Sequence, residues 1–216
     1  PPTPPKTLTD PPTPPSQNPH TYTATPPIYY ISLHESIQMS VAGDSECQGL
    51  DPNANTDYIA WLADNGGADA TDLCGNSVIW SNNASTQQWS GTCVQTITIT
   101  FTATDDCDNA DTTSATFTIN DTTAPDIKVQ AVAGDSECQG LDPNANTDYI
   151  AWLAYYGGSD ATDLCGNSVI WSNNASTQQW SGTCVQTITI TFTVTDDCDN
   201  ADTTSATFTI NDTTAP

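Results

Sequence analysis

The chain has 216 residues and carries 26 acidic side chains against only two lysines, which gives a formal net charge of −24 at pH 7. Nucleic acids and anionic membrane surfaces bind through basic patches, so this charge balance excludes both as partners. No apolar run is long enough to span a bilayer, so we expect no membrane span.

The first 27 residues, PPTPPKTLTDPPTPPSQNPHTYTATPP, are rich in proline. Proline fixes φ and removes a backbone donor, which argues against a helix or a central strand and favours an extended arm of the polyproline II type. We therefore expect an arm over residues 1–27, a first domain over 28–125 and a second domain over 126–216.

Residues 28–41, IYYISLHESIQMSV, alternate apolar and polar side chains, which predicts a lead-in strand. The corresponding stretch before the second domain, DIKVQAV, alternates in the other register. Either a β-bulge restores the register or the first domain has a specialised first strand. The arm and lead-in together are either a linker followed by a first strand or an arm that pairs with the sheet edge of another subunit.

An internal repeat dominates the rest of the chain, because residues 41–125 (repeat 1) match residues 132–216 (repeat 2) at an offset of 91. The copies differ at only four positions: Asp64/Tyr155, Asn65/Tyr156, Ala68/Ser159 and Ala103/Val194. A fibre, stalk or adhesin uses tandem copies to gain length, whereas an enzyme rarely needs its active site copied. We expect NDTTAP, which ends each copy, to be a junction, and further copies of this chain to be its partners.

In repeat 1, residues 57–63 have helical spacing, which predicts a short helix inserted in the β-fold, with Thr56 as its N-cap and Gly66 ending it. Residues 94–104 alternate Ile, Phe and Ala with Thr, which is typical of a strand with one buried face. Further strands are predicted at 77–81 and 115–119. The pattern predicts an all-β fold of tandem immunoglobulin-like β-sandwich repeats, each with one short helix, after a proline-rich extended arm.

Each repeat has four cysteines, which in so lysine-poor a chain favours export and disulfide formation. Four cysteines allow three pairings, and the spacing does not suit zinc. Cys74 and Cys107 lie in similar Asp-rich turns, TDLCGN and TDDCDN, whereas Cys47 and Cys93 border strands. We predict disulfides within each repeat: Cys47–Cys93, Cys74–Cys107, Cys138–Cys184 and Cys165–Cys198.

Acidic residues gather in the turn TDDCDNAD, over residues 104–111, and at the NDTTAP junction. Carboxylate oxygens in a turn suit Ca²⁺, although the spacing is not that of an EF-hand, and a cation at the junction would stiffen the hinge. A solvated acidic turn is the alternative. The candidate ligands are Asp105, Asp106, Asp108, Asp111, Asp121, Asp196, Asp197, Asp199 and Asp202. Ca²⁺ is thus a candidate ligand, and no cofactor is expected to be required.

Two other kinds of surface site are indicated. Asn83, Asn120, Asn174 and Asn211 each begin an N-glycosylation triplet. Trp89, in TQQWSGT, and its counterpart Trp180 are the tryptophans most expected to be exposed, where they would serve as sugar platforms; packing in the core is the other interpretation.

Catalysis has little support in the sequence. Neither repeat contains a histidine, and no GxSxG, phosphate-binding or dinucleotide-binding pattern occurs. A glycosidase would need a cleft with two facing carboxylates. We therefore expect a protein that is not an enzyme.

The strings YIAWLADNGGADATDLCGNSVIWSNN and TITFTATDDCDNADTTSATFTINDTTAP resemble the hyalin-repeat-like, immunoglobulin-like modules of Bacteroidota surface proteins, which include gliding-motility-associated adhesins. The resemblance covers about residues 41–216 and departs from the family at DDCDN, where members read DDCGN. It implies an extracellular, stalk-forming β-sandwich. It also implies O-glycosylation at Asp-Thr-Thr, which here gives Thr112, Thr122, Thr203 and Thr213. The NDTTAP junction is also similar to the Asn-Asp-Asn-Ala-Pro linkers of cadherins, and the arm to hydroxyproline-rich algal surface proteins.

The sequence therefore predicts an extracellular or cell-surface structural protein, a fibre or adhesin stalk built of disulfide-stapled, glycosylated repeats that assemble through the arm by strand addition. The alternative is a carbohydrate-dependent or Ca²⁺-dependent binding module of a surface protein.

Overall fold

The computed structural model describes residues 37–215, apart from residues 75–76 and 167. One compact unit, from Glu35 to Pro216, contains both repeats. The predicted arm over residues 1–27 and the lead-in segment as far as residue 36 lie outside the described residues. None of the described helices is both long and apolar enough to cross a membrane.

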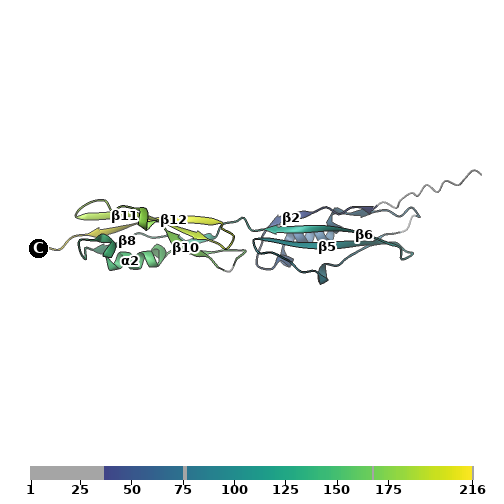
Figure 1. Ribbon diagram of the computed structural model, residues 1–216, viewed down its shortest axis with the longest axis horizontal. Coiled ribbons are helices and arrows are strands. Elements are labelled where there is room, and N and C mark those ends of the chain that lie inside the picture. Colours follow the sequence, from purple (N-terminus) through teal and green to yellow (C-terminus); the bar gives the residue numbers. More distant parts are fainter. Residues whose placement is uncertain (1–36, 75–76, 167, 216) are drawn as a thin grey trace, which may run out of the picture. The chain divides into compact units, whose positions relative to one another are not determined.

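The described residues form an all-β chain with one short α-helix in each repeat, as predicted (Figure 1). The first set of elements is β1 (Ile37–Gln38), β2 (Gly43–Glu46), α1 (Thr56–Ala63), β3 (Asp69–Ala70), β4 (Ile79–Asn82), β5 (Val94–Thr104) and β6 (Ala110–Asn120). The second set is β7 (Asp126–Val129), β8 (Gly134–Glu137), α2 (Thr147–Ala154), β9 (Asp160–Thr162), β10 (Ile170–Asn173), β11 (Val185–Thr195) and β12 (Ala201–Asn211). Short 3-10 turns flank each helix and follow β4 and β10.

Each repeat has a four-stranded sheet, in the order β2-β6-β5-β4 or β8-β12-β11-β10, and a two-stranded sheet, β1-β3 or β7-β9. The long strands β5 and β6 pair antiparallel along their whole length, whereas β2 pairs with β6 in parallel. This parallel pairing has a consequence for function: it brings the end of β2 beside the end of β6, where the chain leaves repeat 1.

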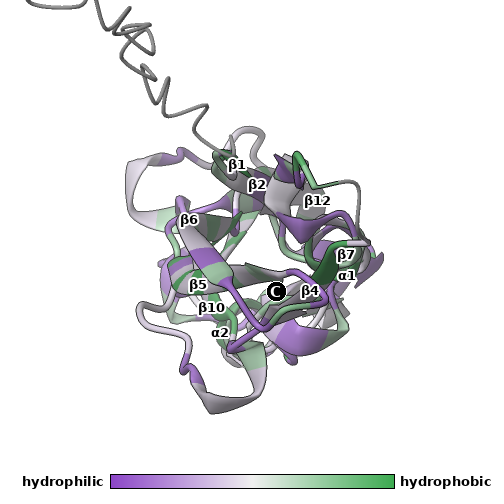
Figure 2. Cartoon of the chain, turned by 90° about the vertical axis from the view of Figure 1, so that its right-hand side faces the viewer, coloured by the Kyte–Doolittle hydropathy of each residue, from purple (hydrophilic) through white to green (hydrophobic). Residues whose placement is uncertain are grey.

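The core follows the predicted period of two. Ile97, Ile99 and Phe101 on β5 are buried, while the threonines between them face outward or lie partly exposed. Helix α1 covers this face, with the ring of Tyr58 5.4 Å from that of Phe117 and the ring of Trp61 5.3 Å from that of Phe101. Figure 2 shows green hydrophobic stretches and purple hydrophilic stretches mixed along the chain. Because α1 takes this place, the facing sheet of the sandwich needs only two strands.

The lead-in strands pair in different registers in the two repeats. Ile37 pairs with Ala70 in repeat 1. The equivalent of Ile37 is Lys128, but Ile127 pairs with Ala161, the equivalent of Ala70, and the register shifts between Ile127 and Val129. The register therefore shifts within β7, as the bulge interpretation requires. Ile127 packs with Ala161 and Val194, which explains why repeat 2 has the larger side chain where repeat 1 has an alanine.

The helix begins one residue earlier than predicted. Asn55, not Thr56, is the N-cap of α1, and its side-chain oxygen accepts from the backbone N–H groups of Asp57 and Tyr58, both at 3.1 Å. The Asn55 amide also donates to the Glu46 carbonyl at 3.0 Å. A buried side chain thus ties the helix start to the end of β2.

Replacing Asn55 by alanine should lower the free energy of unfolding of repeat 1 by about 2 kcal/mol, because it removes a cap and leaves the Glu46 carbonyl without this donor. Asn55→Asp keeps the cap acceptor but not the amide donor, so its loss should be smaller. Urea unfolding measures both. Equal losses for the two variants would contradict the capping role.

Candidate functional site: the junction between the repeats

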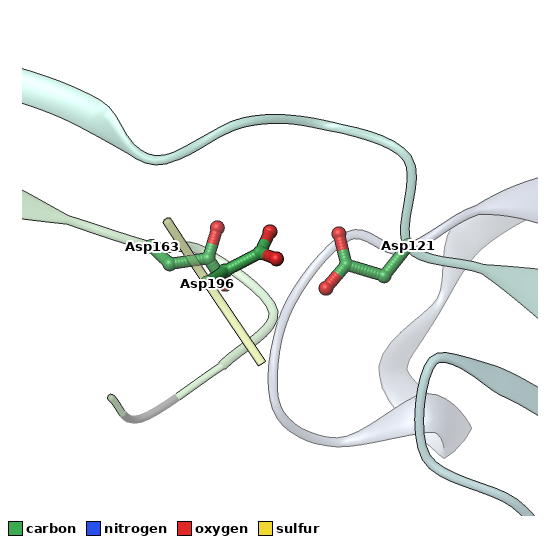
Figure 3. A group of neighbouring side chains, drawn as sticks. All are labelled: Asp121, Asp163 and Asp196. Carbon is green, nitrogen blue, oxygen red and sulfur yellow. The ribbon is translucent and has the colours of Figure 1, made fainter. Parts of the chain in front are cut away.

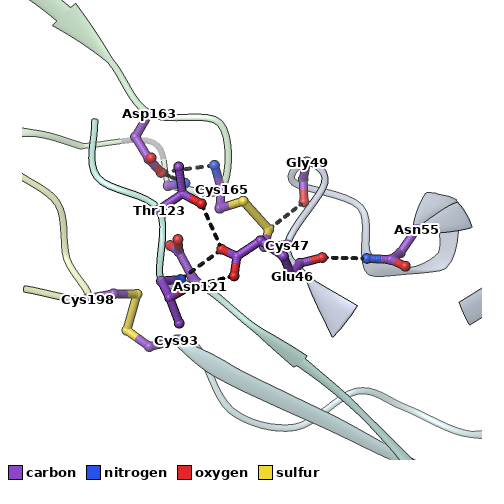
Figure 4. Close-up of a disulfide and its surroundings, with 12 residues drawn as sticks. Glu46, Cys47, Gly49, Asn55, Cys93, Asp121, Thr123, Asp163, Cys165 and Cys198 are labelled. Atoms are coloured by element: carbon purple, nitrogen blue, oxygen red, sulfur yellow. Dashed lines mark hydrogen bonds between the residues drawn. A yellow bond between two sulfur atoms is a disulfide. The ribbon is translucent and has the colours of Figure 1, made fainter. Parts of the chain in front are cut away.

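Two disulfides cross from repeat 1 to repeat 2. Cys47 is bonded to Cys165 and Cys93 to Cys198, over Cα–Cα distances of 6.0 Å and 5.3 Å (Figure 4). The cysteines of each pair are 118 and 105 residues apart in sequence. Both bonds lie beside the chain segment that links the repeats, so the covalent connection between the repeats is threefold.

The predicted pairings Cys47–Cys93 and Cys165–Cys198 are therefore wrong. The predicted pairs Cys74–Cys107 and Cys138–Cys184 do not form either, because in the described part of the chain these four cysteines are free and exposed. Cys47 and Cys93 border strands, as predicted, and both lie at the end of β6: Cys47 donates its backbone N–H to the Asn120 carbonyl, and the Cys93 carbonyl accepts from the N–H of Asp121. Their bonds nevertheless run to the neighbouring repeat rather than to each other.

The linking segment is held by the end of β2. One carboxylate oxygen of Glu46 accepts from the Thr122 N–H at 2.8 Å and from the Thr123 hydroxyl at 3.0 Å, and the other accepts from the Thr122 hydroxyl at 2.7 Å. Burial would raise the pKa of Glu46, but these hydrogen bonds outweigh it and lower the pKa. Pro125, at the end of NDTTAP, is fully buried. The junction sequence thus has a defined conformation.

Three carboxylates converge at this junction, and they are the only such group within the described residues: Asp121, Asp163 and Asp196, each with an oxygen within 4.8 Å of the others (Figure 3). Asp121 follows β6 of repeat 1, while Asp163 follows β9 and Asp196 follows β11 of repeat 2. We call these three residues the Asp cluster. Figure 3 shows Asp121 pointing toward the other two from the opposite side.

Local turns fix the two carboxylates of repeat 2. Asp196, which is buried, accepts from the backbone N–H groups of Cys198 and Asn200 at 2.8 Å and 2.9 Å. Asp163 accepts from the N–H groups of Cys165 and Gly166. Each acidic side chain therefore sits two residues before a disulfide cysteine, so the bonds that join the repeats also position the Asp cluster. The amide of Asn200 adds a direct contact by donating to the Asp121 carbonyl at 3.2 Å.

This arrangement disfavours the charged form of the Asp121 carboxylate. Burial, followed by the charges of Asp163, Asp196 and Glu46, raises its pKa to about 6. Among the described residues, its buried Oδ1 atom has no hydrogen-bond partner. A divalent cation would offset the repulsion and satisfy this oxygen, so the donor set fits a hard ion such as Ca²⁺.

Asp121 and Asp196 are the two predicted metal ligands that the structure brings together. Asp105, the counterpart of Asp196, closes its own turn by accepting from the N–H groups of Cys107 and Asn109, and Asp106 accepts from the Ser77 hydroxyl. The other predicted ligands belong to no converging group among the described residues: Asp108, Asp111, Asp197, Asp199 and Asp202.

Asp163 was not among the predicted ligands. The available signal was its position in TDLCGN, the Asp-rich turn that resembles the turn around Asp196.

The predicted surface sites take ordinary places in the fold. Asn83 and Asn174 are partly buried, and their side-chain oxygens accept from Thr100 and Thr191 N–H groups at 2.9 Å. Asn120 and Asn211 end the strands β6 and β12, while Thr112, Thr122, Thr203 and Thr213 are exposed. Glycosylation at these residues stays a prediction.

Trp89 and Trp180 are partly buried rather than fully exposed. The ring of Trp89 packs edge-on against Tyr58 at 4.9 Å, and its N–H donates to the Asn53 side chain at 3.1 Å. Trp180 repeats both contacts with Tyr149 and Asn144. Their role as sugar platforms also stays a prediction.

No protein-family model matches this sequence, and no curated protein matches it. Among solved structures, human mucin-like protocadherin EC1-2 is 9% identical, with 83% of this chain and 98% of that chain covered and a TM-score of 0.32. Mouse clustered PcdhgC3 EC1-3 is 11% identical, with 82% and 66% covered and a TM-score of 0.32. Human protocadherin-24 EC1-2 is 9% identical, with 68% and 87% covered and a TM-score of 0.30. These TM-scores are too low to support an argument, so membership of the hyalin-repeat-like adhesins stays a prediction.

Proposed function

We propose that this chain is an extracellular structural protein, a fibre or adhesin stalk with no enzymatic activity, in which disulfides lock each repeat to the next. The observation that carries the proposal is that both disulfides run between repeats. A disulfide within a repeat stabilises only that repeat, whereas these bonds transmit force and torque across the junction. Disulfides also persist in oxidising, extracellular surroundings. Glycans on the predicted Asn and Thr sites would suit such a surface.

A measurement of repeat mobility tests this proposal. Backbone ¹⁵N relaxation should give repeat 1 and repeat 2 one common rotational correlation time in the oxidised chain. Reduction should shorten the correlation time of each repeat, because a flexible segment alone would then join them. Independent tumbling of the repeats in the oxidised chain would overturn the proposed function.

We also propose that the Asp cluster binds Ca²⁺ as part of this junction. Asp196 is buried and the other two carboxylates are partly buried. A bound ion would therefore lie between the repeats rather than being offered to an outside ligand. This placement favours a structural ion over the Ca²⁺-dependent binding module, for which exposed coordination positions would be needed.

The pH dependence of stability should reveal Asp121. Its pKa of about 6 in the folded chain exceeds the ordinary value of about 4, so without divalent cations the folded state binds the proton more tightly than the unfolded state. Lowering the pH from about 6 to about 4 should therefore raise the free energy of unfolding, by about 1 kcal/mol once solvent screening is allowed for. Urea unfolding in a chelator checks this.

Asp121→Asn should abolish this pH-dependent gain, and the matched variant Asp212→Asn, at the exposed counterpart in repeat 2, should retain it. Addition of about 1 mM Ca²⁺ at pH 7 should stabilise the wild type and the Asp212→Asn chain but not Asp121→Asn. Equal Ca²⁺ binding by both variants in titration calorimetry would contradict the Asp cluster as the site.

A further inference from the structure

The four free cysteines occupy the same positions as the four cysteines of the junction. A shift of 91 residues carries Cys47 and Cys93 onto Cys138 and Cys184 of repeat 2. The reverse shift carries Cys165 and Cys198 onto Cys74 and Cys107 of repeat 1. The free thiols therefore repeat both sides of the junction. Cys138 and Cys184 correspond to the side formed by repeat 1, and Cys74 and Cys107 correspond to the side formed by repeat 2.

The free cysteines are exposed, although their equivalents at the junction are buried or half-buried. Cys47 is buried and Cys93 half-buried at the junction, while Cys138 and Cys184 are exposed. On the other side, Cys165 and Cys198 are half-buried, while Cys74 and Cys107 are exposed. Asp121 and Asp212 differ in the same direction. The difference reflects the presence or absence of a neighbouring repeat rather than a difference in sequence.

The surfaces concerned are identical in sequence. Three of the four differences between the repeats follow the helix, at 64/155, 65/156 and 68/159, and the fourth lies in the core strand, at 103/194. None of them includes a cysteine, a member of the Asp cluster, Glu46 or Asn200. The conformation of the outgoing end is also kept, because Glu137 accepts from the N–H and hydroxyl of Thr213 as Glu46 does from Thr122.

We propose that a second copy of this chain docks head to tail at the end of repeat 2 and is joined to it by two disulfides. Cys138 of one chain would bond Cys74 of the next, and Cys184 would bond Cys107 of the next. This inference rests on the proposed function, since it continues the locked junction from one chain to another. Each added copy leaves a new pair of free thiols, so the product is a covalent linear polymer.

The bond-forming step needs an electron acceptor, and a small-molecule disulfide serves as one. A protein thiolate attacks the small disulfide and releases one small thiol. The thiolate of the second copy then attacks the mixed disulfide and releases the other small thiol. Each new protein disulfide thus consumes one small disulfide, and the two protein thiols lose two electrons and two protons in total.

Charge opposes the first encounter, because each chain has a net charge of −24. Docking would also bring Asp212 beside Asp72 and Asp105 of the second copy, the counterparts of the Asp cluster. We therefore expect polymer growth to be faster with Ca²⁺ and with raised ionic strength, and slower in a chelator at low salt.

Two variants test the direction of assembly. Cys74→Ser/Cys107→Ser removes the free thiols of repeat 1, and Cys138→Ser/Cys184→Ser removes those of repeat 2. Both variants keep the junction disulfides. Circular dichroism checks the fold of each variant, and non-reducing peptide mapping checks its disulfides. Each chain is oxidised with glutathione disulfide and analysed on a non-reducing gel. The unaltered chain should give a ladder in steps of 22.8 kDa. Each variant alone should remain monomeric, and an equimolar mixture should give a dimer and lose every larger species.

The bonds in the mixed dimer identify the pairing. With one variant labelled with ¹⁵N, mass spectrometry should find Cys74–Cys138 and Cys107–Cys184 between differently labelled chains. Dimers of either variant alone, bonds within one chain such as Cys74–Cys107, or no dimer in the mixture would overturn the proposal. If Cys47–Cys165 and Cys93–Cys198 are still found in those monomers, the proposed function survives; if other pairs are found, both fall.

Discussion

Pulling the oxidised chain from its two ends should extend it roughly 400 Å less than pulling the same chain after reduction. The difference arises because Cys47–Cys165 bypasses 118 residues of backbone, which then carry no tension. The bypassed segment contains the whole linking segment and the core strands of repeat 1. Single-molecule force spectroscopy measures this hidden length directly, with the four free cysteines replaced by serine so that no further bonds form.

Removing one disulfide at a time gives a sharp control, because the two disulfides span different numbers of residues. Their separations of 118 and 105 residues differ by 13, so removal of Cys47–Cys165 by Cys47→Ser leaves a path only 13 residues longer. That is an increase of roughly 45 Å. Cys93→Ser should add nothing, because Cys47–Cys165 remains the shorter path. A large gain in either single variant would contradict the observed pairing.

Under load, the parts of the chain before Cys47 and after Cys165 carry the tension, and the segment between them forms a loop that carries none. The residues between Cys47 and Cys165 stay unextended even if repeat 1 unfolds, so force cannot draw out the linking segment. A stalk that depended on a flexible six-residue junction would yield there first. The bonds thus give the proposed structural role its physical basis, because they move the load from the backbone of the junction to covalent sulfur bonds.

The local structure could be predicted from the sequence because it depends on neighbours in the chain. The alternation of Ile97, Ile99 and Phe101 with threonine defines a strand and its buried face without any knowledge of the fold. The helix begins one residue earlier than predicted, since Asn55 and Thr56 are both good capping residues and the sequence does not show that Asn55 is also held by the Glu46 carbonyl at the end of β2.

The junction could not be predicted in the same way. In a near-identical tandem repeat, a cysteine has the same surroundings in sequence whether it bonds within its repeat or to the next one. The pairing depends on two strand alignments at the end of β6: the parallel alignment of β2 places Cys47 beside the outgoing chain, and the antiparallel alignment of β5 places Cys93 there. The Asp cluster likewise joins residues of both repeats. The sequence therefore predicted Asp121 at the junction and Asp196 in an acidic turn as separate candidates, and it did not predict Asp163.

Phe101→Ala should destabilise repeat 1 by about 3–5 kcal/mol, a large share of the stability of a domain of this size. The Phe101 side chain is completely buried, and it lies against Trp61 and so close to Gly66 that a Cβ atom there would be 2.9 Å from its ring. No neighbour can move in to fill the space without disturbing the helix end. Urea unfolding followed by tryptophan fluorescence should therefore show repeat 1 unfolding well before repeat 2.

The equivalent residue of repeat 2, Phe192, gives the matched control for Phe101→Ala. Phe192→Ala removes the same ring from repeat 2, where Trp152 lies at 5.2 Å, and should reverse the order in which the repeats unfold. Thr98→Ala, on the outer face of β5, removes only an exposed hydroxyl pair with Thr116 and should cost about 0.5 kcal/mol. If the two phenylalanine variants each gave one transition for the whole chain, the unfolding of the two repeats would be coupled. Reduction would then separate the two transitions only if the sulfur bonds carry that coupling, which links the stability of each repeat to the same junction that resists force.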